Sequence, residues 1–91
     1  MEPKDFVYFI GTDFDYYGMT FTVHSVTMFG SLDNEKRELI VAKNKNDNSV
    51  HSFIYAPDLF LLEYYGDFDD IDSAYPETRD WLTATNEWTR I

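Results

Sequence analysis

The run MTFTVHSVTM, residues 19–28, determines the fold that we expect for this chain. Its first part alternates apolar and polar side chains, which predicts a β-strand with one buried face. The alternation breaks at Ser25, because the apolar side chains of Val26 and Met28 fall on the opposite parity. A β-bulge or a sharp bend at Ser25 would return these side chains to the inward face. The run therefore predicts a long, bent strand in a small barrel or curved sheet.

Turn-forming residues divide the neighbouring sequence into further short strands. Gly30 and the run Asp33–Lys36 indicate one turn, and the polar stretch Asn44–Asn48 indicates a hairpin loop. Residues 12–18 are expected to form a loop that follows an apolar first strand. Strands that recur at this spacing are typical of an all-β barrel or sandwich. Besides residues 19–28, the predicted strands are residues 6–10, 37–43, 49–55 and 59–65.

Three segments of this pattern resemble small SH3-like barrels. They are Gly18-x-x-Phe21-x-Val23, Leu39-Ile40-Val41-x-Lys43 and His51-Ser52-Phe53-x-Tyr55-x-Pro57-Asp58-Leu59. In that family, a glycine-led strand, two hairpin strands and a short turn before the last strand close the barrel. The resemblance implies a mainly β fold, either a five-stranded SH3-like barrel or a strongly bent antiparallel sheet, with its core in residues 6–65. It transfers no functional residues, because the fold alone does not define a site.

The last part of the chain, residues 66–91, is expected to be an acidic and aromatic extension of the same single domain, residues 1–91. Gly66–Ser73 is acidic and is expected to be irregular. Pro76 is expected to be the first residue of a short helix, with Glu77 in the first turn where its charge suits the helix dipole. The side chains expected to pack inward are Trp81 and Leu82 from this helix, or Trp88 from a closing strand over residues 86–91.

The composition predicts a folded domain of modest size. Apolar residues make up 44% of the 91-residue chain and aromatic residues 19%, so a core can offset the entropy of the chain. There is no cysteine, which excludes disulfides and thiolate metal sites. The sequence shows neither a membrane-spanning stretch nor a signal peptide at its first residues, and we expect a cytoplasmic location, in the host cytoplasm if a phage encodes the chain.

The net charge of −10 is unevenly distributed. Residues 1–51 carry eight acids and five bases, whereas residues 52–91 carry nine acids and two bases. This charge argues against direct binding to nucleic acid and to anionic membranes. A general need for solubility does not explain the asymmetry, and we therefore expect a basic protein as the partner.

Residues 46–78 contain no lysine or arginine but are rich in acidic and aromatic side chains. Residues two apart in an extended chain point the same way about 6.6 Å apart, and Asp67/Asp69 and Asp70/Asp72 have this spacing. DNA also presents regularly spaced charges, about 3.4 Å apart along each strand, so carboxylates could occupy the contacts of a DNA-binding protein. Nearby aromatic rings would anchor the interface. The predicted partner-binding residues are Asp67, Asp69, Asp70, Asp72, Glu63, Glu77, Tyr64, Tyr65 and Phe68.

Other kinds of site fit the sequence less well. Residues 67–78 fail the EF-hand pattern, because Asp72 occupies the glycine position and Thr78 the position of the final glutamate. His24 and His51 alone do not make a zinc site, although they could lie close together if their strands pair. No nucleophile or phosphate-binding motif is present, so we expect neither catalysis nor a cofactor. The remaining alternative is a solvated acidic loop whose aromatic rings belong to the core.

The sequence thus favours a non-enzymatic, acidic protein-binding module. The more specific hypothesis is a DNA-mimic inhibitor of a nucleic-acid-binding or nucleic-acid-processing protein. Phages and mobile elements encode anti-defence inhibitors of this type. This last step is an analogy from charge and size. The alternative is a structural or assembly module, a homodimer, a larger homo-oligomer or a virion component, in which aromatic side chains form the subunit interface.

Overall fold

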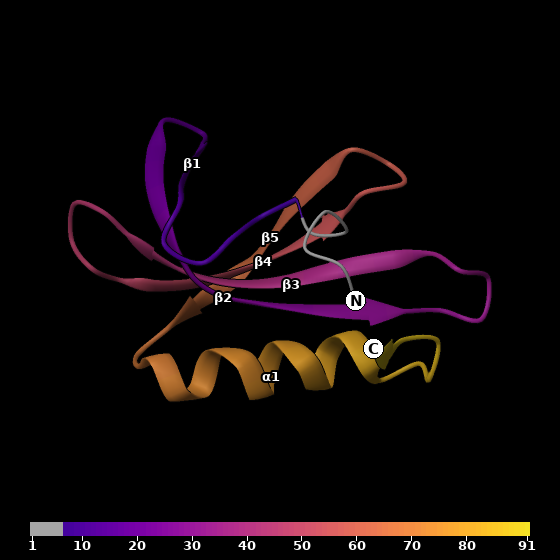
Figure 1. Cartoon of the computed structure of the whole chain (residues 1–91). Coiled ribbons are helices and arrows are strands. Elements are labelled where there is room, and N and C mark those ends of the chain that lie inside the picture. Colours follow the sequence, from indigo (N-terminus) through magenta and orange to yellow (C-terminus); the bar gives the residue numbers. More distant parts are fainter. Residues whose placement is uncertain (1–6) are drawn as a thin grey trace.

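The computed structural model describes residues 7–91, which form a mainly β fold with one helix (Figure 1). Five antiparallel strands follow one another in the order β1-β2-β3-β4-β5 and curl into a half-barrel, and the short β6 pairs with β2. The general shape is compatible with an SH3-like fold. The elements are β1 (Asp13–Tyr16), β2 (Met19–Gly30), β3 (Lys36–Asn44), β4 (Val50–Ala56), β5 (Leu61–Phe68), α1 (Ile71–Thr83) and β6 (Thr89–Arg90).

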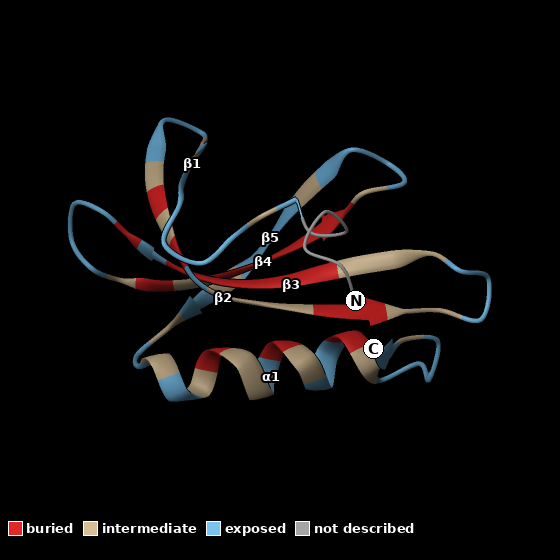
Figure 2. Ribbon diagram, viewed as in Figure 1, coloured by how far each residue is buried: buried red, intermediate tan, exposed pale blue. Residues whose placement is uncertain are grey.

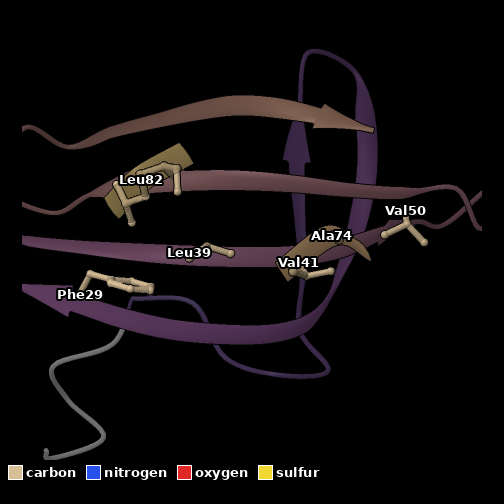
Figure 3. Close-up of a cluster of buried hydrophobic side chains, with 7 residues drawn as sticks. Phe29, Leu39, Val41, Val50, Ala74 and Leu82 are labelled. Carbon is tan, nitrogen blue, oxygen red and sulfur yellow. The ribbon is translucent and has the colours of Figure 1, made fainter. Parts of the chain in front are cut away.

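Both faces of the sheet are buried at its centre, so β3 is buried along most of its length (Figure 2). Consecutive residues Leu39–Ala42 have no exposed surface, and their alternating side chains belong to two separate clusters. The helix α1 covers one face of the sheet (Figure 1). Figure 3 shows Ala74 and Leu82 of α1 among the buried side chains on this face. The helix-side core consists of Phe29, Leu39, Val41, Val50, Ile54, Ala74 and Leu82. The opposite cluster, the aromatic core, consists of Phe21, Val23, Ile40, Ala42, Phe53 and Tyr55, with Tyr8, Phe14, Tyr16, Val26 and Leu62 packed against it.

The bend predicted in the second strand is confirmed. The register between β2 and β3 shifts between Val23 and Ser25, so that Val23 faces Ala42 while Ser25 faces Val41. A bulge of this kind increases the local twist and curls the sheet. The predicted hairpin loop at residues 44–48 and the strands that flank it are also confirmed.

The N-terminal predictions were wrong. Residues 7–10 of the predicted first strand form a bend and a turn, and Phe6 lies outside the described residues. The predicted loop at residues 12–18 contains β1, which forms a hairpin with β2. Tyr17 and Gly18 at its tip both have positive φ, at 48° and 80°, which suits a tight two-residue hairpin turn. The strand at residues 13–16 alternates acidic and aromatic side chains, and the aromatic ones close over the aromatic core.

The helix begins earlier than the sequence suggested. Asp70 is its N-cap residue and accepts a hydrogen bond from the Ser73 amide at 2.8 Å. Pro76 therefore lies inside the helix, and the prediction that it starts the helix was wrong. Leu82 is buried as predicted, but Trp81 is 53% exposed. Both C-terminal alternatives occur, because the short β6 follows the helix and Trp88 packs against the helix-side core.

A buried carboxylate attaches the first described residues to the sheet. Glu38 of β3 has no exposed surface, and its oxygens accept hydrogen bonds from the Val7 and Tyr8 amides at 3.0 Å each. Burial raises the pKa of Glu38 above its ordinary 4.5, although the two amides act in the opposite direction. Tyr8 then packs against Tyr55 and Phe14 with ring centroids 5.2 Å away in each case.

Candidate functional site

Most of the predicted partner-binding residues lie on β5 and on the chain that leads from it into α1. β5 is at the edge of the sheet, and among the described strands only β4 pairs with it. Its outer backbone groups therefore face away from the sheet, as at any edge strand. Several large apolar side chains near this edge are exposed: Leu59, Phe60, Leu61, Tyr64, Tyr65 and Trp81.

The two tyrosines of β5 lie on opposite faces of the sheet, because successive side chains of a strand alternate. The register shifts between Ser52 and Phe53, so that Tyr64 faces Phe53 and Gly66 faces Ser52, with Tyr65 between them. The Tyr64 hydroxyl is hydrogen-bonded to Nδ1 of His51 at 2.9 Å, and its ring lies over the aromatic core. The Tyr65 ring lies on the helix side of the sheet, next to Trp81.

Tyr64 is only partly available to a partner. Its ring is 41% exposed and stacks on Tyr16 of β1 with centroids 6.2 Å apart. Partial burial raises the pKa of Tyr64, and the nearby charge of Asp67 adds to this effect. The hydroxyl therefore stays protonated at neutral pH and can donate a hydrogen bond.

The aspartates gather at the junction between β5 and α1, but they do not continue in strand geometry. Asp67 is still in β5, opposite His51, whereas β5 ends at Phe68. Asp70 caps the helix and Asp72 lies in its first turn. The strand-like spacing predicted for Asp70 and Asp72 was therefore wrong, and all four aspartates are exposed.

The two glutamates lie farther from this junction. Glu63 faces Ile54 in the β4–β5 ladder, four residues before Asp67 and so about 13 Å along the strand. Glu77 is exposed on α1, next to the buried Thr78. The structure thus brings Asp67, Asp69, Asp70 and Asp72 together at one end of the sheet, with Glu63 and Glu77 at a distance from them.

These carboxylates are not neutralised by the described part of the chain. Within residues 7–91, the ion pairs join Arg37 to Glu35 and Asp58, Lys45 to Asp13, and Arg79 to Asp80. None of the six predicted acidic residues takes part in them. Their charge is therefore not balanced by an ion pair within residues 7–91.

A groove beside β5 was missed by the sequence analysis. Its volume is about 260 Å³, and it is lined by Ile54, Glu63, Tyr64, Tyr65 and Trp81. Trp81 was expected to face the barrel, but buried residues recur at Ala74, Thr78 and Leu82, which puts Trp81 at the side of the helix. The i, i+4 spacing of Ala74, Thr78 and Leu82 indicates the buried face of the helix. A helix that starts at Pro76 does not include Ala74, so the sequence prediction did not use this spacing.

Other chemistry receives no support from the described residues. β3 lies between β2 and β4, so His24 and His51 are not on neighbouring strands. Within residues 7–91, no three histidine, aspartate or glutamate side chains are placed to hold a metal ion. The only helix described there is too short and too polar to cross a membrane.

Comparisons with protein-family models, with curated proteins and with solved structures give no match for this chain. The fold and the site therefore define only a class: a small, curled β-sheet domain with an acidic junction and an aromatic edge strand.

Proposed function

We propose that the protein is a non-enzymatic binding module whose acidic surface docks on a basic, nucleic-acid-binding or nucleic-acid-processing protein. One observation carries the proposal: the exposed carboxylates around the β5–α1 junction form no ion pair with any described cation, and exposed aromatic rings lie beside them. Charge of this kind attracts lysine and arginine, and aromatic side chains are enriched at the centres of interfaces.

The proposed mechanism is competition with nucleic acid. The carboxylates of Asp67, Asp69, Asp70 and Asp72 would meet the lysine and arginine side chains that otherwise contact phosphates. Because the chain turns into a helix after Asp70, the mimicry would rest on the local density of charge and not on a regular phosphate-like repeat. An anti-defence inhibitor encoded by a phage or mobile element would act in this way.

Neutralising the four aspartates to asparagine is expected to weaken binding by more than about tenfold at low salt, because electrostatic complementarity would be lost. Asparagine at position 70 can still cap α1, so the fold should be retained. The measurement is displacement of labelled duplex DNA from a panel of purified DNA-binding proteins, including nucleases and CRISPR effectors, at two salt concentrations. The unmodified protein should compete, and less strongly at the higher salt concentration.

A matched control removes the same charge from elsewhere. Asp13, Asp15 and Asp33 changed to asparagine, with Glu87 changed to glutamine, alter exposed carboxylates outside β5 and α1. This variant should retain most of the competition. Equal losses in both variants, or competition that neither variant reduces, would contradict a localised acidic docking surface.

The open edge of β5 also favours a second candidate function, assembly into a homodimer or a larger structural array. Two β5 strands could pair edge to edge and bury Tyr65 and Tyr64. Charge opposes this, because antiparallel pairing centred on Tyr65 sets Glu63 against Asp67 of the second copy. Light scattering separates the candidates: a stable dimer at low salt would favour assembly, and a monomer would favour the docking module.

A further inference from the structure

The groove between β5 and α1 combines aromatic walls, an apolar floor and one carboxylate. The rings of Tyr65 and Trp81 have centroids 5.1 Å apart at an interplanar angle of 52°, so they form a corner and not a closed stack. Ile54, which also lines the groove, is 6% exposed, and Glu63 is the only charged side chain among the described residues that line it. Tyr65 and Trp81 remain 37% and 53% exposed.

Two other aromatic rings of this protein each contact an arginine side chain. Arg37 lies over the Trp88 ring with its guanidinium carbon 4.5 Å from the centroid, and it also pairs with Asp58. Arg79 lies over Tyr75 at 5.5 Å and pairs with Asp80. In both cases one guanidinium contacts an aromatic face and a carboxylate at once, which is the combination that suits its planar, delocalised charge.

The β5–α1 groove has the ring faces and the carboxylate of these two sites but, among the described residues, no cation. No described arginine or lysine lies over Trp81 or Tyr65, and Glu63 makes no ion pair with a cation of residues 7–91. We infer that this groove receives an arginine side chain of the basic partner, stacked against Trp81 and Tyr65 and paired with Glu63. This inference rests on the proposed docking function and adds the chemistry of one recognised residue.

Arginine is the expected occupant because its guanidinium can stack on an aromatic face and still offer two donors to a carboxylate. Lysine presents a compact, strongly hydrated charge and gains less from the ring faces. The open edge of β5 runs beside the groove, so an extended segment of the partner could approach with its backbone along Leu61–Tyr64. Preference for arginine over lysine therefore distinguishes this groove from general attraction to negative charge.

Three peptide probes of equal length test the inference: alternating arginine–glycine, lysine–glycine and citrulline–glycine sequences. The protein carries Trp88→Phe, so that indole fluorescence reports Trp81 alone. We expect the arginine peptide to change the Trp81 emission and to bind about three- to fivefold more tightly than the lysine peptide. The citrulline peptide should leave the emission unchanged, because it keeps the shape and lacks the charge.

Two variants locate the effect, with binding followed by calorimetry. Trp81→Ala and Glu63→Gln should each reduce affinity for the arginine peptide about three- to fivefold, and Trp81→Ala should abolish the preference over lysine. Tyr17→Ala, which removes an exposed ring from the β1–β2 turn, is the matched control and should change nothing. Equal affinities for arginine and lysine peptides, or affinities that both variants leave unchanged, would overturn the inference.

The outcome is separable from that of the proposed function. If the four-aspartate variant loses competition with DNA while peptide binding shows no arginine preference, docking stands and the groove assignment fails. If the arginine preference depends on Trp81 but the unmodified protein displaces no DNA, the groove assignment stands and DNA mimicry fails.

Discussion

Truncation of Phe53 to alanine is expected to lower the free energy of unfolding by about 3–5 kcal/mol. Phe53 of β4 has no exposed surface and lies at the centre of the aromatic core. Its ring centroid is 5.0–5.4 Å from those of the four rings around it, and the variant would lose these contacts and leave a cavity. The four rings are Phe14, Tyr16, Phe21 and Tyr64.

A loss of this size is a large part of the total stability, which is about 5–14 kcal/mol for a chain of this length. Phe53 also connects elements far apart in the sheet, because it touches β1, β2 and β5 at once. Its removal should therefore open the curl of the half-barrel, and we expect exposure of Tyr64 to rise. The measurement is urea denaturation followed by circular dichroism.

Phe60→Ala provides the control, since it deletes the same side chain from a position that is 87% exposed. Its effect should stay within about 0.5 kcal/mol, as for most surface substitutions. Similar losses for both variants would show that the aromatic core does not hold the sheet together in the way the contacts indicate.

The central strands could be predicted because their sequences are locally consistent. Alternation in residues 19–24 and its break at Ser25 led directly to the bulge, and the polar run at residues 44–48 led to the hairpin between β3 and β4. In both cases the signal lies in adjacent residues, where period-two burial and turn chemistry act.

The ends of the chain could not be predicted in the same way. The apolar run at residues 7–10 has the composition of a strand, yet tertiary contacts place it as a bend whose amides bind Glu38. β1 was predicted as a loop because aspartate is common in loops, although acidic and aromatic side chains alternate over Asp13–Tyr16 as in a strand. The start of the helix was predicted from Pro76, whereas the helix begins after the cap formed by Asp70 and Ser73. A capping residue of this kind indicates a helix start better than the proline does.

For the site, sequence separation explains what was predicted and what was missed. The density of carboxylates in residues 63–77 is a local property and could be seen directly. The groove depends on contact between Trp81 of α1 and Tyr65 of β5, which requires the phase of the helix and the alternation of β5 together. Neither could be obtained from composition, so the sequence indicated charge but not the aromatic corner.

The Glu38→Ala variant is expected to lose about 2–4 kcal/mol of stability. Its carboxylate is fully buried and is the acceptor for the Val7 and Tyr8 amides, which would lose these partners. Tyr8 should then leave its place against Phe14 and Tyr55, which would uncover part of the aromatic core. Thermal and urea denaturation measure the loss, and faster exchange of the two amides would locate it.

Glu38→Gln tests the charge separately from the hydrogen bonds. Burial raises the pKa of Glu38 in the folded protein above its ordinary 4.5, so folding favours the protonated carboxyl. The stabilising contribution of this group is therefore complete below its unfolded pKa and is lost as the pH rises through the folded value. Glutamine keeps an acceptor oxygen without ionising, and its variant should lack this part of the pH dependence.

The measurement is the difference in unfolding free energy between the unmodified protein and Glu38→Gln across the pH range from 4 to 8. The other carboxylates are common to both proteins, including Asp13, whose pKa is lowered mainly by its hydrogen bond with Lys45, so their contributions cancel. We expect the glutamine variant to gain stability relative to the unmodified protein as the pH rises from about 4.5. A difference that stays constant over this range would mean that Glu38 ionises in the folded protein without a cost of burial, and that its carboxylate is better solvated than its contacts with Val7 and Tyr8 indicate.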